Sequence, residues 1–309
     1  MSFVELIYRG QDRIYGLWWQ MEQIKIGIGV SSIGRFLPLI GKAAGLFEKE
    51  NISVEVVNQQ DEEKIVDDIV TQETPVGTPN APSLIFSLLD GNDLVIVGGI
   101  LNRPAFYLAA NTTIGGIADL KGKSIGINQP RRMAGMVMLA LLRRWGLDIQ
   151  SDLAVVDLGL NDKSLEALRA GQIDAALLPP EKAFLAEEEG FNLVADSLDL
   201  DCHWVPLATT RQFLAANTEL VTKIASIYVE SIRLFKSQPQ ATLREIKRWL
   251  PALANKPAVL ERCYELFAAH FEPTLTPSLN SLGSILGEAA LQDPRAGKLR
   301  TASLVKNLI

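Results

Sequence analysis

The sequence is poor in the residues from which metal centres and disulfide scaffolds are built. It contains two cysteines, Cys202 and Cys263, and two histidines, His203 and His270, among 309 residues. The cysteines lie far apart and lack the short spacing of a zinc site, so we expect buried or free thiols. Two well-separated histidines also argue against a histidine metal site or a serine triad. We therefore predict no metal, no cofactor and no catalytic residues.

Long apolar runs and basic stretches are also missing. No segment reaches the roughly 18 consecutive apolar residues that a transmembrane helix needs. The net charge is −6, and no basic stripe is interleaved with aromatic residues, so nucleic acid is not an expected partner. The apolar core of a signal peptide would be interrupted by Glu5, Arg9, Asp12 and Arg13. Met21 is an alternative start, and from either methionine we see no export signal.

The sequence does contain a repeated alternation of strands and helices. Apolar residues make up 48% and charged residues 21%, an ordinary balance for a globular protein. Residue periodicity predicts a first block with strands at 24–30, 52–57, 75–78, 93–100 and 105–110 and helices at 36–48, 61–71 and 83–89. A second block has strands at 124–128, 154–158, 173–178 and 193–195 and helices at 133–145, 162–170 and 181–189.

Long helices follow the second block, and few strands are expected after residue 210. These helices are predicted at 217–236, 240–249, 256–270 and 278–290. We expect them to wrap the first block, because no strands remain to form a third sheet. The predicted fold class is α/β with two lobes, each a doubly wound, mainly parallel sheet.

The predicted division of the chain has three parts. They are an N-terminal extension at 1–22, lobe 1 at 23–105 and 206–309, and lobe 2 at 106–205. A chain that leaves lobe 1 once and returns once puts a cleft between the lobes. Such lobes open and close about hinges, which we expect at 103–108 and 203–208.

Several phrases, in order, resemble one family of binding proteins. They are GLFE at 45–48, Asp90-Gly91 before a strand, IADLKGK at 117–123, WGL at 145–147, LRAGQIDAA at 168–176 and Gly190-Phe191. From about residue 23 to about residue 290, the chain resembles the periplasmic solute-binding proteins of the aliphatic-sulfonate, nitrate/taurine and thiamine-pyrimidine-precursor (NMT1/THI5-like) group. The resemblance implies the type II binding-protein architecture, a small-molecule ligand in the cleft, and delivery to a membrane ABC transporter.

The resemblance leaves the cellular role open between alternatives. It implies a periplasmic or extracytoplasmic protein that meets an ABC transporter permease, whereas a genuine N-terminus without a signal would place the protein in the cytoplasm. There the same fold serves enzymes of the pyrimidine-precursor synthase, decarboxylase or dehydratase type, and a ligand sensor is a third alternative. Cys202, His203 and Cys263 do not reproduce the cysteine-rich motif of the pyrimidine synthases. We expect a non-catalytic, monomeric binding protein.

Polar loops after the strands form the predicted ligand site, because α/β folds bind ligands beyond the carboxyl ends of their strands. The predicted ligand-binding residues are Ser31, Ser32, Ile33, Thr78, Pro79, Asn80, Arg103, Gln129, Arg131, Arg132, Pro180, Glu181 and Trp204. Arg131 and Arg132 begin the helix at 133–145, where guanidinium and backbone N–H groups would hold an oxyanion. We therefore expect an anionic or heterocyclic ligand. Relatives usually have a Gly- or Ser-rich helix start here, so the ligand's identity is not carried over.

Three of these residues allow a second interpretation. Arg103 contacts the ligand or forms an ion pair between the lobes. Glu181 meets a cationic or amine group of the ligand, or it favours the dipole of the helix that it begins. Trp204 stacks on a ligand ring or packs the hinge.

Overall fold

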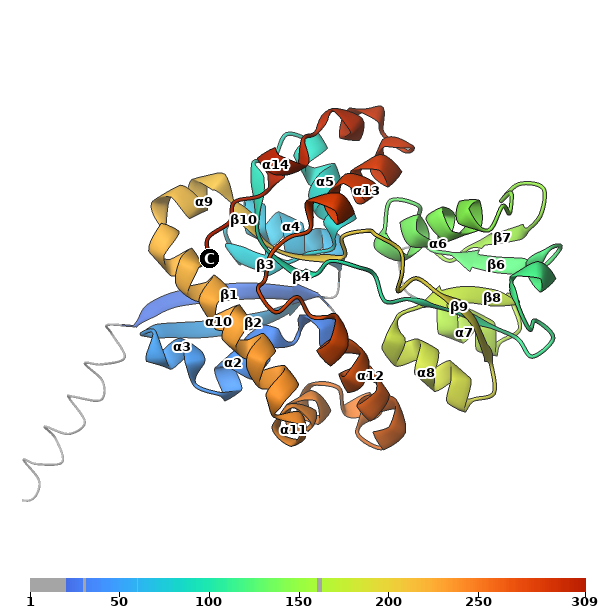
Figure 1. Ribbon diagram of the computed structural model, residues 1–309, viewed down its shortest axis with the longest axis horizontal. Helices are drawn as coiled ribbons and strands as arrows, with labels where there is room; N and C mark the ends of the chain where they lie inside the picture. The colour runs from blue at the N-terminus through green and yellow to red at the C-terminus, as the bar shows by residue number, and fades with distance from the viewer. Residues whose placement is uncertain (1–20, 30–31, 60, 160–162) are drawn as a thin grey trace, which may run out of the picture.

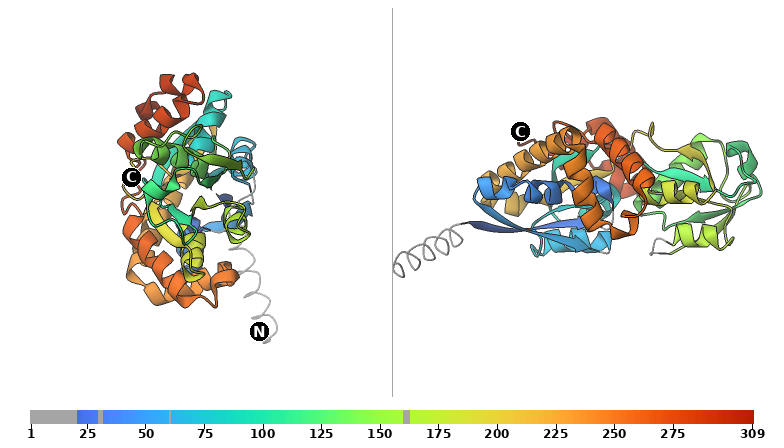
Figure 2. Two further views of the ribbon diagram at one scale, coloured as in Figure 1. Left: turned by 90° about the vertical axis from the view of Figure 1, so that its right-hand side faces the viewer. Right: turned by 90° about the horizontal axis from the view of Figure 1, so that it is seen from below.

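The computed structural model describes residues 21–29, 32–59, 61–159 and 163–309. Two bodies lie side by side and are joined by two chain segments (Figure 1, Figure 2). Each body is built on one five-stranded sheet, which confirms the predicted two-lobe α/β fold. Most of the predicted extension at 1–22, one end of the predicted strand at 24–30 and one end of the predicted helix at 162–170 lie outside the described residues.

The sheet of lobe 1 has the strand order β2-β1-β3-β10-β4. Its strands are β1 (Glu22–Gly29), β2 (Ile52–Gln59), β3 (Val76–Thr78), β4 (Leu94–Leu101) and β10 (Val205–Thr210). β10 is antiparallel to both of its neighbours, and the other four strands point the same way. Every residue of β3, β4 and β10 is buried, although β4 lies at one edge of the sheet, as expected for strands that helices cover on both faces.

Lobe 2 repeats this topology with the strand order β7-β6-β8-β5-β9. Its strands are β5 (Tyr107–Ala110), β6 (Ser124–Ile127), β7 (Ala154–Asp157), β8 (Ala175–Leu178) and β9 (Asn192–Asp196), and its helices are α6 (Met133–Arg144), α7 (Ser164–Arg169) and α8 (Pro180–Glu188). β5 is antiparallel to its neighbours and takes the place that β10 has in lobe 1. β10 and β5 are each fourth in the spatial order of their sheet. Each is also the first strand that the chain forms after crossing from the other lobe.

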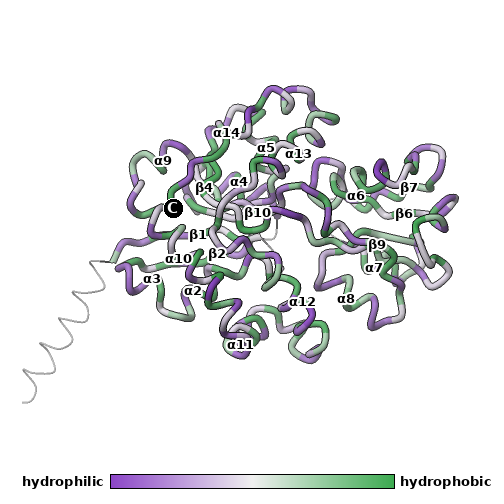
Figure 3. Tube along the Cα trace, viewed as in Figure 1, coloured by the Kyte–Doolittle hydropathy of each residue, from purple (hydrophilic) through white to green (hydrophobic). Residues whose placement is uncertain are grey.

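The helices after residue 210 pack on lobe 1, as predicted. The helical elements of lobe 1 are η1 (Ile33–Arg35), α2 (Leu37–Ala43), α3 (Leu46–Lys49), α4 (Glu62–Val70), α5 (Ala81–Leu89), α9 (Arg211–Ala216), α10 (Thr218–Ser237), α11 (Pro239–Trp249), η3 (Pro251–Leu253), α12 (Pro257–His270), α13 (Leu279–Ala290), η4 (Pro294–Lys298) and α14 (Thr301–Leu304). α10 contacts α2, and α13 contacts α5. Apolar residues are frequent within the strands of both lobes, whereas polar and apolar residues alternate along the outer helices (Figure 3). None of the described helices is long and apolar enough to cross a membrane.

The structure corrects two sequence-based expectations. The helix expected at 36–48 is divided into α2 and α3, because Gly45 adopts a left-handed φ of 68° between them, and η1 precedes it. β10 was not expected as a strand, since Pro206 lacks the N–H that a central strand normally donates. The register shifts between Val205 and Pro206, which lets the proline enter the sheet. The expected hinge at 103–108 overlaps β5, and the one at 203–208 overlaps β10. The segments that cross between the lobes without forming strands are therefore 102–106 and 197–204.

Gly135 in α6 sets how closely this helix approaches the loop after β6. A Cβ at this position would collide with the carbonyl oxygens of Gln129 and Asn128, the latter at 2.5 Å. We predict that Gly135→Ala lowers the free energy of unfolding by about 1–3 kcal/mol, measured by urea denaturation. Gly287→Ala in α13 is the matched control, because no described heavy atom beyond the adjoining backbone of its own helix lies within 4 Å of the added Cβ, and alanine favours a helix over glycine by about 1 kcal/mol. Equal effects of the two substitutions would contradict tight packing at Gly135.

Candidate functional site

The two lobes meet where strands end. Ile33 follows β1 in lobe 1, and Glu181 follows β8 in lobe 2. The Oε1 atom of Glu181 accepts a hydrogen bond from the backbone N–H of Ile33 at 2.7 Å. Since the carboxyl ends of parallel strands are where α/β folds bind ligands, we take this junction between the lobes as the candidate site.

Glu181 is a buried acid at the centre of the junction. It is the second residue of α8, and only 6% of it is exposed. Its Oε2 atom has no partner with good hydrogen-bond geometry in the described part of the chain. Burial raises the pKa of Glu181, and the N–H of Ile33, the hydroxyl of Ser32 and the charge of Arg35 oppose that rise in part. The carboxyl is therefore held where its charged form is costly.

Arg35 and Glu62 form the lobe 1 side of the junction, and the sequence analysis missed both. Arg35 is 3% exposed. Its Nη1 atom lies 2.7 Å from Oε1 of Glu62, and its Nη2 atom donates to Oδ1 of Asn80 at 2.5 Å. A Cβ at Gly29 would collide with this guanidinium, so glycine at the end of β1 makes room for it. The available signal was position, because Arg35 and Glu62 stand shortly after β1 and β2.

Two predicted anion-binding arginines pair with carboxylates of lobe 1. The Nη2 atom of Arg132 lies 3.0 Å from Oδ1 of Asp61 and 3.6 Å from Oε1 of Glu63. Arg131 lies 3.8 Å from Oδ2 of Asp293. Both guanidinium groups thus have carboxylate partners from within the chain in this conformation. They link the two lobes at one rim of the junction.

Ion pairs also link the lobes at the opposite rim. Nζ of Lys256, the N-cap residue of α12, lies 2.9 Å from Oε2 of Glu188 in α8. Arg262 pairs with Glu187, and its guanidinium lies 4.0 Å from the ring centroid of Phe184. These side chains are part-exposed, so each pair contributes little by itself, about 0–1 kcal/mol. Together with the pairs of Arg131 and Arg132, they are called the interlobe pairs below.

The sequence matches a known family over most of its length. Residues 36–242, about two thirds of the chain, match the family described as NMT1/THI5 like. This chain belongs to the NMT1/THI5-like family. The resemblance proposed from the sequence phrases is therefore confirmed. Among curated proteins, none matches this sequence at a significant level.

Solved structures of binding proteins share the fold. The periplasmic aliphatic sulphonate binding protein SsuA from Escherichia coli has a TM-score of 0.76 at 19% identity, over 93% of this chain and 92% of that one. The alkanesulfonate-binding protein SsuA from Xanthomonas axonopodis pv. citri, bound to MOPS, has a TM-score of 0.73 at 19% identity, over 93% and 99%. A ligand-binding component of an ABC-type import system from Staphylococcus aureus, with zinc bound, has a TM-score of 0.74 at 12% identity, over 93% and 97%. At such identities the likeness establishes the fold.

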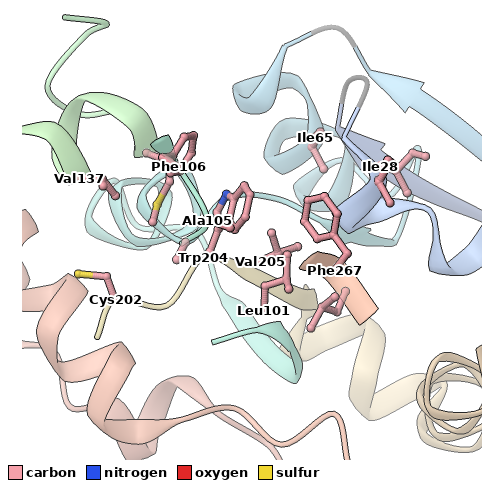
Figure 4. Packing of buried hydrophobic residues seen from close by; sticks show 14 of the residues in the cluster. Ile28, Ile65, Leu101, Ala105, Phe106, Val137, Cys202, Trp204, Val205 and Phe267 are labelled. Atoms are coloured by element: carbon pink, nitrogen blue, oxygen red, sulfur yellow. The ribbon is translucent and has the colours of Figure 1, made fainter. Parts of the chain in front are cut away.

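In this NMT1/THI5-like chain, Trp204 packs where the chain crosses between the lobes. It is 4% exposed, and its ring centroid lies 5.0 Å from that of Phe106 and 6.3 Å from that of Phe267 (Figure 4). This arrangement favours the hinge-packing interpretation over stacking on a ligand. The neighbouring His203 is fully buried, and burial lowers its pKa to about 3, so its ring is neutral at physiological pH.

The predicted site residues fall into groups by exposure. The buried ones are Ile33, Thr78, Pro79, Pro180, Glu181 and Trp204; the part-buried ones are Ser32, Asn80, Gln129 and Arg132; the exposed ones are Arg103 and Arg131. Ser31 lies outside the described residues. The contacts above bring Ser32, Ile33, Asn80 and Glu181 together around Arg35. Arg131 and Arg132 lie at one rim, and Arg103 and Trp204 lie on the crossing segments.

Two pockets lie away from the junction. One, of about 500 Å³, includes Gln23, Ser53 and Phe213 in its lining, at the amino ends of β1 and β2. The other, of about 550 Å³, surrounds Asn192 on lobe 2. Neither lining includes Arg35 or any of the predicted ligand-binding residues, so the junction remains the candidate site.

The buried carboxyl of Glu181 should make the stability of this NMT1/THI5-like protein depend on pH. Because its pKa is raised on folding, the folded state binds the proton more tightly than the unfolded chain, and stability falls as the pH rises above the ordinary carboxyl range. Glu181→Gln removes this titration and keeps an acceptor for the N–H of Ile33. We predict that the Tm of the wild type, relative to that of the variant, falls by at least about 2 °C between about pH 5 and about pH 8, measured by calorimetry.

The control is Glu187→Gln, which removes a part-exposed carboxylate from the same helix. Its Tm should follow that of the wild type across the same pH range. A constant Tm difference between wild type and Glu181→Gln would show that the charged form of Glu181 is not penalised.

Proposed function

We propose that this NMT1/THI5-like protein captures a small organic solute between its two lobes and delivers it to an ABC importer. One observation carries the proposal: groups from the strand ends of both lobes converge on a buried point, where Glu181 contacts the N–H of Ile33 at 2.7 Å. The SsuA proteins and the S. aureus import component, which share the fold, support a role in solute binding for import.

The mechanism we propose is closure about the crossing segments. When the lobes separate, the Glu181–Ile33 hydrogen bond and the interlobe pairs break, and the polar groups of Ser32, Asn80 and Gln129 become available. A solute that contacts both lobes favours the closed state by its differential affinity for that state. The interlobe pairs re-form around it as the lobes close.

Partner and location belong to the same proposal. We propose that the protein works outside the cytoplasm as a monomer and presents its closed form to the permease of the importer. We also propose the division into lobe 1 at 23–105 and 206–309 and lobe 2 at 106–205. It is supported by the strands: apart from the first residues of β1 and β10, Glu22 and Val205, the first part contains β1–β4 and β10, and the second contains β5–β9.

The described residues give no particular support to an enzyme on this scaffold. The thiols of Cys202 and Cys263 are buried, and burial raises the pKa of both, that of Cys202 to about 12. Neither is a thiolate at neutral pH, so neither is an activated nucleophile.

Ligand screening tests the proposed function. The full chain is purified without denaturant, examined by native mass spectrometry for a co-purified molecule, and screened by thermal shift against sulfonates, aromatic carboxylates, pyrimidines and flavins. We expect one class to raise the Tm, since a ligand that binds only the folded form stabilises it, and we expect it to be recovered intact. Chemical turnover of the bound compound, or no retained or stabilising compound, would contradict the proposal.

Arg132 should contribute to closure without being needed for folding. We predict that Arg132→Ala, which removes the pairs with Asp61 and Glu63, weakens the binding of the stabilising compound about 2–5-fold, measured by calorimetric titration at low salt. The effect should shrink at high salt, because salt screens exposed charges. Arg169→Ala is the matched control: Arg169 pairs with Glu189 at 2.5 Å within lobe 2 and should leave affinity unchanged. Equal losses in the two variants would exclude a closing role for Arg132.

A further inference from the structure

Glu181 meets three elements at once. Its carboxyl lies at the start of α8 and contacts η1 through the N–H of Ile33. α12 packs against both α8 and η1, and the charge of Glu181 contributes to the raised pKa of Cys263 on α12. The carboxyl is therefore enclosed by both lobes. One of its oxygens is engaged, and Oε2 is buried without a well-aligned partner in the described chain.

The positive charges near Glu181 are already neutralised. Arg35 lies within 2.7 Å of the Glu62 carboxylate and donates to Asn80. Arg132, at the rim, is paired with two carboxylates of lobe 1. Around Arg35, two carboxyl groups face one guanidinium, so the junction has a surplus of negative charge when Glu181 is ionised.

An oxyanion ligand would compete with this arrangement. Backbone N–H groups and a guanidinium are the groups that hold sulfonates and phosphates, and here a carboxyl of the chain itself takes the N–H of Ile33. A second anion beside Glu181 would be repelled at short range in a site of low polarity. A cation or a group with several N–H donors would instead use Oε2, which has no well-aligned partner among the described residues, and offset the cost of burying the carboxylate.

We propose that Glu181 is the specificity-determining residue of the junction: its carboxyl occupies the place of an oxyanion, excludes free sulfonates, and selects a ligand that presents an amidinium-like or amine donor group. This inference rests on the proposed function, since it names the ligand class of that same site. It predicts that the junction prefers a cationic donor group, whereas Arg131 and Arg132 led us to expect an anionic ligand from the sequence.

Matched probes test the proposal on the full chain. Benzamidine and benzenesulfonate share a ring and differ in the sign of the charged group, and acetamidine and methanesulfonate form a smaller pair. Calorimetric titration at neutral pH should show the wild type binding an amidinium at least about tenfold more tightly than the sulfonate of the same pair. Glu181→Gln should lower amidinium affinity about tenfold and remove the preference, because the amide is neutral and also donates. Glu166→Gln, at an exposed position of α7 outside the interlobe pairs, should keep it.

The outcomes separate this inference from the proposed function. Wild-type preference for the sulfonate of either pair, or failure of both amidinium probes to bind, would overturn the role of Glu181, as would an unchanged preference in Glu181→Gln. Each of these results leaves solute capture standing if native mass spectrometry shows a retained small molecule. Absence of any retained or stabilising compound would remove the proposed function and this inference together. The wild-type comparison decides the proposal even if Glu181→Gln folds poorly.

Discussion

The two segments that cross between the lobes are hydrogen-bonded to each other at both ends. At lobe 1, the N–H of Trp204 donates to the carbonyl of Leu101 at 3.0 Å. At lobe 2, the N–H of Ser197 donates to the carbonyl of Phe106, and the hydroxyl of Ser197 accepts from the N–H of Phe106, both at 2.9 Å. In the proposed closure, the backbone rotations would therefore fall in the few residues between these ties. The Glu181–Ile33 contact is possible because this short hinge lets the two sets of strand ends face each other.

The balance at the junction suits a protein that must open. Burying the Glu181 carboxyl opposes closure, because its charged form loses hydration. The interlobe pairs at both rims favour closure, but they are part-exposed and individually weak. In the proposed closure, these two contributions oppose each other. A ligand that contacts both lobes can thus decide the population of closed molecules with a modest free energy.

Local pattern predicted most of the elements but not the partners of the charged residues. Strands such as β4 were predicted because a buried apolar run is visible in the sequence itself. β10 was missed because Pro206 argues against a central strand, and only its antiparallel partners show that a register shift accommodates it. Arg35 and Glu62 were missed for a related reason. The acidic helix at 61–71 looks like a solvated face, and nothing local indicates that Glu62 meets a buried arginine.

The same limit affected Arg131 and Arg132. Their position at the start of α6 was predicted well, and their residue type suggested an anion clamp. Their carboxylate partners come from α4, its N-cap and the residue before η4 (Pro294–Lys298). The sequence distances to these partners are long, so no periodicity could have revealed them. Which charge is free for a ligand is a property of the folded junction.

With the proposed role of Glu181, fold and specificity are controlled by different residues in this chain. The shared topology of the two sheets depends on buried apolar strands, and it persists in binding proteins at 19% identity. The chemistry of the junction depends on Arg35, Glu62 and Glu181, which lie in loops and helix starts just beyond the strands. Because these side chains add nothing to the apolar cores of the sheets, exchanging them can change what is recognised while the lobes and hinge stay intact. A family fold consequently locates the site far better than it identifies the ligand.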